Sequence, residues 1–283
     1  MSKILVTGAT GTVGRKLLRQ LRASGLPFRA LVRSHEKGKA LDCEYAVGDF
    51  DQPQTLDAAL DGIDALFLNG PGGEPLLRQQ IPAIERARAA GVKRIVKLSA
   101  RGADANSKSA FSRFHGQVER VLADSGVAWS VLRPGSFMQN LLRNAAVVRS
   151  EGKIYGAYKD GRVALVDVED VAACALVLLR NDDRAGQVFT LSGPEAASFP
   201  EIAAKLAAAL GKPVSYEDLS PEQMVARLKS NGTPAAFAEG MVGLMRQYAS
   251  GAAAEVTSAI SELLGRPARN YDQFFADNAN AFR

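Results

Sequence analysis

The residues best suited to chemistry lie near the beginning of the chain, where three glycines follow a short apolar run. Residues 6–14 read VTGATGTVG. In this pattern Gly8 permits a sharp turn, Gly11 lets the main chain approach a ligand, and Gly14 lets the next helix pack on the strand. The first turn of that helix offers free N–H groups to a diphosphate. The residues expected to hold a dinucleotide here are Gly8, Thr10, Gly11, Thr12, Val13 and Gly14.

The end of the second expected strand bears on the choice of dinucleotide. An acidic residue at this point would bind the ribose hydroxyls of NAD. This chain has Arg33 there, and Lys37 follows. A guanidinium and an ammonium suit a 2′-phosphate by charge and hydrogen bonding, so we expect NADPH, with NADH left open. The alternative for Arg33 is an ordinary solvated surface arginine.

Apolar runs alternate with segments of helical period through the first half of the chain. Strands are expected over residues 4–7, 28–32, 44–47, 65–68, 94–98 and 128–132, and helices over 13–23, 75–90 and 111–124. This alternation predicts βαβ units and the doubly wound parallel sheet of a Rossmann α/β fold. Ligands bind such sheets at the carboxyl ends of the strands, so the site is expected at that edge.

The second half of the chain has a different rhythm. A strand over residues 162–166 and a helix over 168–179 are expected to return to the main sheet, and residues 198–283 are mostly helical by period. Ser198 and Ser220 each precede a Pro and a Glu or Gln in patterns that begin helices. We therefore expect a Rossmann domain over 1–150, with a return of about 160–192, and a smaller, mainly helical substrate-binding lobe over 193–283.

Composition limits the classes of protein that the chain can belong to. The formal net charge is +5, and the 35 Lys and Arg are scattered, so no nucleic-acid partner is expected. Two cysteines, Cys43 and Cys174, and two histidines predict neither a disulfide framework nor a metal site. Without a leader or an apolar run of bilayer length, we expect a cytoplasmic protein that does not cross a membrane.

Further motifs along nearly the whole chain match those of one known family. Besides the glycine spacing, they are Gly48-Asp49, Lys97-Leu98-Ser99-Ala100, His115 with Glu119, LRPGSFMQN at 132–140, and Gly265-Arg266-Pro267 before Phe274-Phe275. The chain thereby resembles the atypical short-chain dehydrogenase/reductases, and more narrowly their NmrA-like group. That group includes type-2 quinone oxidoreductases, azo-dye and triphenylmethane-dye reductases, and cofactor-sensing regulators.

The resemblance implies that residues after the third to sixth strands complete the coenzyme site. They are Asp49 and Phe50 at the adenine, Asn69, Gly70 and Pro71 at the nicotinamide ribose, and Ser99, Pro134, Gly135, Ser136 and Phe137 at the nicotinamide. Each group falls at the carboxyl end of an expected strand, where the doubly wound fold places ligands.

The chain departs from most short-chain dehydrogenases at their catalytic pair. Those enzymes carry Tyr-x-x-x-Lys on the helix after the fifth strand, whereas this chain has Phe111 and His115. A phenylalanine cannot donate a proton, so ordinary alcohol–ketone chemistry is not expected. His115 and Ser99 are the catalytic candidates, and His115 could bind a ribose hydroxyl, orient the substrate or relay a proton near neutral pH. A histidine packed under the helix is an equal alternative.

Loss of the tyrosine favours acceptors that need little acid catalysis. Hydride transfer to a quinone gives a phenolate-like product whose conjugate acid has a pKa of about 10. Positioning against the nicotinamide then carries most of the catalysis. Candidate substrate-binding residues are Phe137, Met138, Tyr155, Tyr158, Met241 and Met245. We therefore expect an NADPH-dependent reductase of a small aromatic acceptor such as a quinone or azo dye. A non-catalytic NAD(P)-sensing regulator is the alternative, a sugar-nucleotide epimerase is disfavoured, and a homodimer is left open.

Overall fold

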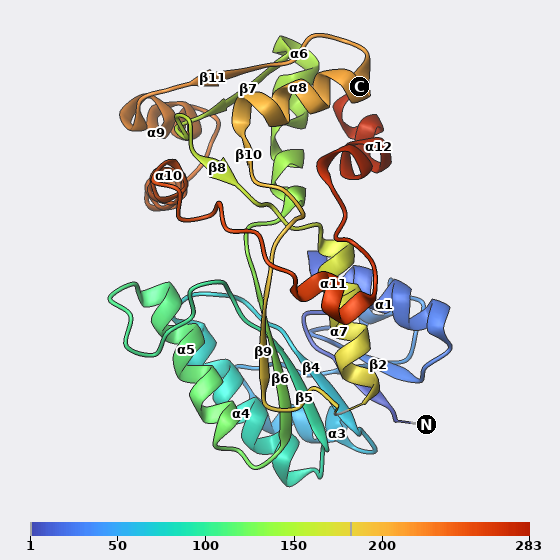
Figure 1. Ribbon diagram of the computed structural model, residues 1–283. Coiled ribbons are helices and arrows are strands. Elements are labelled where there is room, and N and C mark those ends of the chain that lie inside the picture. Colours follow the sequence, from blue (N-terminus) through green and yellow to red (C-terminus); the bar gives the residue numbers. More distant parts are fainter. Residues whose placement is uncertain (1, 182) are drawn as a thin grey trace. The chain divides into compact units, whose positions relative to one another are not determined.

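A seven-stranded parallel sheet forms the framework of the first of two structural units (Figure 1). The computed structural model describes residues 2–181 and 183–283. Contacts between Cα atoms group Met1–Pro134, Val168–Leu191 and Ala259–Arg266 into unit 1. They group Gly135–Asp167, Ser192–Ser258 and Pro267–Arg283 into unit 2. The chain therefore enters each unit more than once.

The large sheet of unit 1 has the strand order β3-β2-β1-β4-β5-β6-β9, and all its strands are parallel. The strands are β1 (Ile4–Val6), β2 (Phe28–Val32), β3 (Tyr45–Val47), β4 (Ala65–Leu68), β5 (Arg94–Leu98), β6 (Ala128–Pro134) and β9 (Gln187–Leu191). The first six are the strands expected from the apolar runs. The reversal of strand order beside β1 confirms the predicted doubly wound Rossmann fold.

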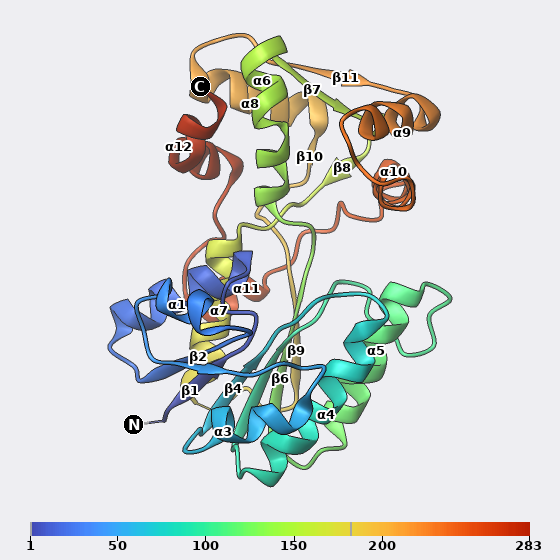
Figure 2. The ribbon, with the colours of Figure 1, turned by 180° about the vertical axis from the view of Figure 1, so that it is seen from behind.

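Helices cover both faces of this sheet, as the two opposite views show (Figures 1 and 2). α1 (Thr12–Ser24) and α7 (Val168–Arg180) pack against each other on one face, with α11 (Ala259–Leu264) beside α7. The opposite face carries α4 (Pro75–Ala89) and α5 (Ala110–Ala123), with η1 (Pro53–Leu56) and α3 (Asp57–Leu60) beside α4. The short α2 (His35–Lys39) links β2 to β3. The apolar core under α4 and α5 includes Leu66, Leu68, Ile84, Ile95, Val118 and Leu122.

The prediction that residues 162–166 return to the large sheet as a strand is wrong. β8 covers only Arg162–Val163 and pairs antiparallel with β10 (Ala197–Ser198) in a separate two-stranded sheet. The next residues are buried, but the backbone N–H groups of Ala164 and Val166 donate to the loop carbonyls of Ala253 and Ser136. Burial without pairing to the large sheet explains why this apolar run was assigned to that sheet. The seventh strand of the large sheet is β9 instead.

Unit 2 is mainly helical and has its own apolar core. Its helices are η2 (Met138–Asn144), α6 (Ala145–Glu151), α8 (Phe199–Leu210), α9 (Pro221–Ser230), α10 (Ala235–Ala249) and α12 (Tyr271–Phe282). A second small sheet pairs β7 (Lys153–Gly156) with β11 (Ser215–Asp218). Ser198 and Ser220 begin α8 and α9 with reciprocal capping boxes, which confirms both predicted helix starts. The core includes Met138, Phe199, Ile202, Tyr271, Phe274, Phe275 and Phe282.

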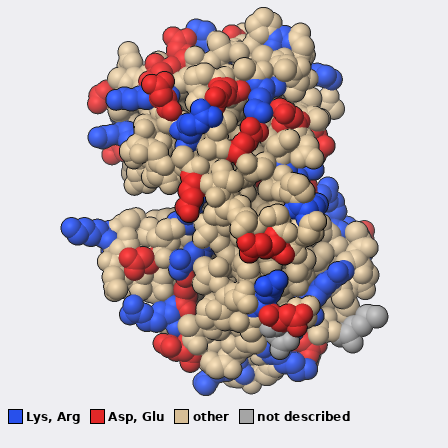
Figure 3. Space-filling view, viewed as in Figure 1, with Lys and Arg blue, Asp and Glu red and all other residues tan. Residues whose placement is uncertain are grey.

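Charged residues of both signs are mixed on the face of the molecule in Figure 3, where no patch of one sign dominates. Within the described residues, no helix combines the length and apolar character needed to cross a bilayer. In the same residues, no three His, Cys, Asp or Glu side chains converge in a way suited to a metal ion.

Candidate active site

The glycine turn, residues 8–14, connects β1 to α1 and depends on the absence of side chains. Gly8 has a φ of +62°, and a Cβ added to it would lie 2.6 Å from Nδ2 of Asn69. A Cβ on Gly14 would lie 2.2 Å from the carbonyl oxygen of Gly8. Gly11 donates its N–H to that same oxygen at 2.9 Å and precedes α1 without a side-chain cap. The first turn of α1 is therefore available to an anion, and the turn fits a bound diphosphate.

Thr7 ties the glycine turn to the loop after β4. Its Oγ1 lies 2.7 Å from the carbonyl oxygen of Asn69 and accepts the Asn69 N–H at 2.8 Å. The next residue, Gly70, faces Phe50: a Cβ on Gly70 would lie 3.3 Å from the Phe50 ring. The structure thus brings Gly8, Asn69, Gly70 and Phe50 together, and the exposed Pro71 follows in the same loop.

The cations expected at a 2′-phosphate are exposed at the end of β2. Within the described residues, the side chains of Arg33 and Lys37 form no hydrogen bond or ion pair, while Ser34 caps α2 by accepting the Lys37 N–H. Asp49 is half-buried after β3. Asp51, which the sequence did not single out, pairs with Arg78 and accepts a hydrogen bond from Gln79. The Gln79 bond, with the charges of Arg78 and Arg33, lowers the pKa of Asp51.

A buried polar cluster lies on the side of β5 that faces α4 and α5. We call it the β5 polar cluster, and its members are Gln80, Lys97, Ser99, His115 and Glu119. Lys97 and Ser99 are two residues apart along one extended segment, so both side chains point to the same face. Ser99 Oγ lies 3.4 Å from Nδ1 of His115, and it donates a hydrogen bond to Glu119. The two catalytic candidates, Ser99 and His115, are therefore neighbours.

Partners within the cluster determine which atoms donate. Glu119 forms an ion pair with Arg133, so its carboxylate accepts hydrogen bonds. Ser99 uses its only O–H on Glu119, which leaves Nδ1–H of His115 as the donor to Ser99 Oγ. Nε2 of His115 is then the acceptor of a neutral ring. The hydrogen-bond pattern assigns one tautomer to this histidine.

Electrostatics also keep His115 neutral. Burial, and secondarily the nearby charge of Lys97, lower the pKa of His115 to about 3. A ring with this pKa does not exchange protons near neutral pH, which argues against a proton relay. The buried ring with one bonded nitrogen also fits the alternative of a histidine packed under the helix. Phe111, the residue in place of the usual tyrosine, contacts the His115 ring edge-on with a centroid distance of 4.9 Å. A Cβ on Gly72 would lie 3.6 Å from the same Phe111 ring.

Sequence reasoning did not select Gln80 or Lys97 as site residues. Lys97 is fully buried, and burial lowers its pKa to about 7 against the opposing charge of Glu119. Its Nζ donates to Oε1 of Gln80 at 2.8 Å. A lysine inside the apolar run 95–98 was the available signal, because a buried strand rarely contains one without a partner.

The candidate substrate residues occupy three different environments within unit 2. Met138 is fully buried in the main core, and Tyr158 stacks on Phe199 with a centroid distance of 3.6 Å. Met245 is buried in a second apolar cluster, against which Tyr155 packs. Phe137 and Met241 are half-buried. Pro134 ends β6 in unit 1, whereas Gly135, Ser136 and Phe137 belong to unit 2, where the hydroxyls of Ser136 and Tyr248 are hydrogen-bonded.

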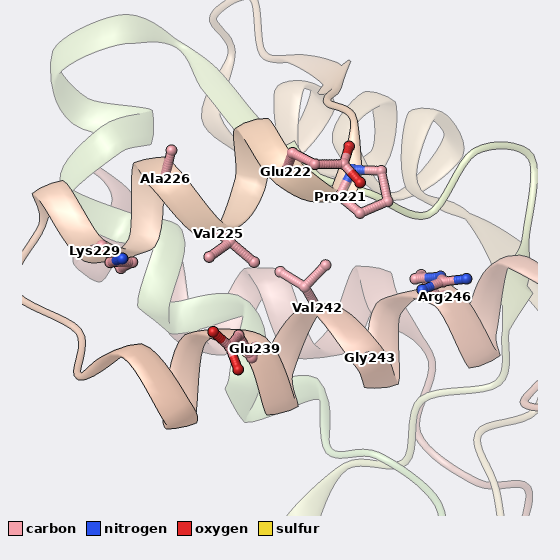
Figure 4. Close-up of a pocket in the computed structure, with 9 residues that line it drawn as sticks. All are labelled: Pro221, Glu222, Val225, Ala226, Lys229, Glu239, Val242, Gly243 and Arg246. Atoms are coloured by element: carbon pink, nitrogen blue, oxygen red, sulfur yellow. The ribbon is translucent and has the colours of Figure 1, made fainter.

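Each unit also has a surface hollow. The larger, of about 720 Å³, lies between α9 and α10, where Val225 and Val242 face each other (Figure 4). A second, of about 470 Å³, borders α5 and β6 in unit 1 and includes Glu119 and Arg133. Neither hollow includes a residue of the glycine turn. Of the β5 polar cluster, the second hollow includes only Glu119.

The geometry of unit 1 is typical of one class of protein. A glycine turn without side chains opens α1 at the point where the strand order reverses, as in dinucleotide-binding Rossmann proteins. A sequence profile of a family described as NAD(P)H-binding matches residues 8–182. The chain belongs to this NAD(P)H-binding family.

Relatives over the full length narrow the class further. The NAD(P)H azoreductase of Xenophilus azovorans is 36% identical over 282 residues, which cover 99% of both proteins. The NADPH-dependent quinone oxidoreductase QOR2 of Escherichia coli, solved with NADPH, has a TM-score of 0.88 and 30% identity, covering 98% of this chain and 100% of that one. The triphenylmethane reductase of Citrobacter sp., solved with NADP(H), has a TM-score of 0.88 and 25% identity, covering 98% and 99%. These similarities confirm the predicted family, its NAD(P)H cofactor and the class of NAD(P)H-dependent reductases.

Proposed function

We propose that this protein is an NADPH-dependent reductase that transfers hydride to a small aromatic acceptor such as a quinone or an azo dye. The observation that carries the proposal is that the glycine turn occurs together with Phe111, a side chain that cannot donate a proton, in contact with His115 where most short-chain dehydrogenases have a tyrosine. An azoreductase, a quinone oxidoreductase and a dye reductase among the relatives support the same acceptor class. Hydride transfer to a quinone gives a phenolate-like product whose conjugate acid has a pKa of about 10, so such an acceptor needs little proton donation.

The coenzyme would be held largely by main-chain atoms. The glycine turn and the first turn of α1 suit the diphosphate, and Asp49 and Phe50 would flank the adenine. Arg33 and Lys37 are exposed and unpaired within the described residues, which leaves both cations available to a 2′-phosphate. Asn69, Gly70 and Pro71 would border the nicotinamide ribose. When bound, the reduced nicotinamide supplies the hydride.

Ser99 and His115 would orient the reactants rather than exchange protons with them. His115 is neutral and presents Nε2 as an acceptor, while Ser99 is held by Glu119. Pro134, Gly135, Ser136 and Phe137 would lie by the nicotinamide, with Phe137, Tyr155 and Met241 as proposed contacts of the acceptor. Of the other two candidates, Met138 is buried in the main core of unit 2, and Met245 is buried in the cluster against which Tyr155 packs. A cytoplasmic location stays a prediction, and the oligomeric state stays open.

A steady-state assay tests this function. Purified protein is supplied with NADPH or NADH and with a panel of quinones, azo dyes and aliphatic ketones. We expect coenzyme oxidation with the aromatic acceptors, a preference for NADPH and little turnover of the ketones. Coenzyme binding without turnover of any acceptor would favour the non-catalytic sensor, which the replacement of the usual tyrosine by Phe111 also suits.

A further inference from the structure

Lys97 is a fully buried lysine to which the proposed function assigns no task. Its Nζ donates to Oε1 of Gln80 at 2.8 Å and to the carbonyl oxygen of Leu98 at 3.3 Å. A neutral amine has two N–H donors, so both bonds persist whether or not the side chain is protonated. Burying a lysine is unfavourable, and an apolar side chain would fit an interior strand better. Burial of Lys97 therefore lowers the stability of the fold, and its hydrogen bond to Gln80 indicates what the lysine does.

The partner is a side chain whose orientation matters. A glutamine amide has an acceptor oxygen and a donor nitrogen on the same carbon, and Lys97 donates to the oxygen. The bond therefore fixes the orientation of the Gln80 amide, with Oε1 toward Lys97 and Nε2 pointing away from it. This Nε2 lies 3.4 Å from the position of a Cβ on Gly70, at the turn that also faces Phe50. Within the described residues it donates no hydrogen bond, although Gln80 is 1% exposed. An oriented pair of N–H groups thus lies unused beside the Gly70 turn.

We propose that Lys97 is a positioning residue for the coenzyme: it holds the Gln80 amide so that Nε2 donates to an oxygen of bound NADPH beside Gly70. The inference rests on the proposed function, which places the nicotinamide ribose at Asn69, Gly70 and Pro71. Gln80 makes the contact, and Lys97 acts only through it. The ligand chemistry recognised is an acceptor oxygen of the ribose or of its neighbouring phosphate.

The test is a double-mutant cycle on NADPH affinity, measured by calorimetry without an acceptor. Gln80→Leu removes the donor and is expected to weaken binding about tenfold, the effect of one buried hydrogen bond. Lys97→Met frees the amide to rotate and should give a similar loss. The double variant should bind no more weakly than Gln80→Leu alone, because Lys97 has no other route to the coenzyme. Losses that multiply in the double variant, or NADPH affinity unchanged in Gln80→Leu, would overturn the proposal.

A second variant guards against misfolding. Gln80→Glu retains an acceptor for Lys97 and the same volume but lacks the N–H donors, so it should lose NADPH affinity at least as much as Gln80→Leu while its melting temperature stays close to wild type. Ser130→Ala is the matched control, since Ser130 is a buried residue of the same sheet and its Oγ donates a hydrogen bond to the carbonyl oxygen of Arg184. It should leave NADPH affinity unchanged.

Failure of this inference and failure of the proposed function give different results. A wild-type protein that binds NADPH but reduces no acceptor contradicts the reductase, and the binding cycle can still be completed on it. If the folded Gln80→Glu protein instead binds NADPH as well as wild type and reduces quinones normally, the reductase stands. The Lys97–Gln80 pair is then purely structural.

Discussion

The glycine turn and the β5 polar cluster belong to the same unit but are built in opposite ways. The turn depends on missing side chains, because a Cβ on Gly8 or Gly14 would overlap neighbouring atoms. The cluster depends on side chains that satisfy one another in the core, from Lys97 and Gln80 to Ser99 and Glu119. The glycine turn is therefore determined by backbone conformation, whereas the β5 polar cluster is determined by hydrogen bonds between side chains.

This difference predicts how each region responds to change. A close-packed backbone has no alternative arrangement, so adding one side chain to the turn should remove its function entirely. A polar cluster can exchange partners, so its variants should show graded effects that depend on pH or on the ligand.

Gly14→Val should abolish coenzyme binding. Even the first atom of the new side chain would lie 2.2 Å from the Gly8 carbonyl oxygen and 2.8 Å from Cα of Ala9, so α1 must move away from the turn. We expect NADPH affinity to fall by at least about 100-fold, together with a loss of about 1–3 kcal/mol in the free energy of unfolding. Calorimetry and denaturant unfolding measure the two effects.

The control for this variant is Gly240→Ala in α10. An added Cβ there has no atom within 4 Å, so it should leave NADPH binding unchanged and slightly stabilise the helix. Retained NADPH affinity in Gly14→Val would show that the segment is only a turn.

Lys97→Met should change how stability depends on pH. Burial lowers the pKa of Lys97 from 10.5 to about 7, with the Glu119 charge opposing, and neutral His115 as the other titratable neighbour. Between these values the unfolded chain binds a proton that the folded chain does not, so wild-type stability rises with pH in this window. The free energy of unfolding of the wild type, minus that of Lys97→Met, should rise by up to about 1.4 kcal/mol per pH unit in this window.

Denaturant unfolding of both proteins across this window measures the difference, and subtraction cancels the groups that they share. Below about pH 7 the difference should become constant. Parallel stability curves for the two proteins over the whole window would mean that Lys97 stays protonated in the folded state.

Arg33→Ala should lower NADPH affinity much more than NADH affinity. Charge-assisted hydrogen bonds to a 2′-phosphate correspond to a loss of roughly 10- to 100-fold, and NADH has no phosphate at that position. Arg19→Ala, which removes a surface cation that pairs with Glu169, is the matched control and should not change the ratio. Equal losses for both coenzymes would contradict the assignment of Arg33.

The same contrast explains how much of the site could be predicted. Glycine spacing reports backbone geometry directly, so the turn, the six strands beside it and the fold followed from local patterns. The place of β9 in the large sheet, and the pairing of residues 162–163 with β10 instead, depend on distant segments of the chain. An apolar run does not indicate which segment it will pair with. Lys97 was quoted within a motif but received no role, and Gln80 was not selected, because they lie 17 positions apart and only the packing of α4 on β5 brings them together. Met138 was selected as a substrate-binding candidate, and its full burial depends on how unit 2 packs rather than on the local sequence.

His115 gives the smallest and most specific test, because its variants need not change activity much. The structure predicts a neutral ring with the proton on Nδ1, held by Ser99, and a pKa of about 3. Nitrogen chemical shifts, assigned by comparison with His115→Gln, should show this tautomer without titration between about pH 5 and 8. The free energy of unfolding should decline as pH falls from 6.5 toward about 3, because the unfolded ring binds a proton in this range and the folded ring does not. His115→Gln should remove this part of the decline. A titration midpoint near neutral pH would instead restore His115 as a proton relay, and the cluster would then act through proton exchange as well as through hydrogen-bond direction.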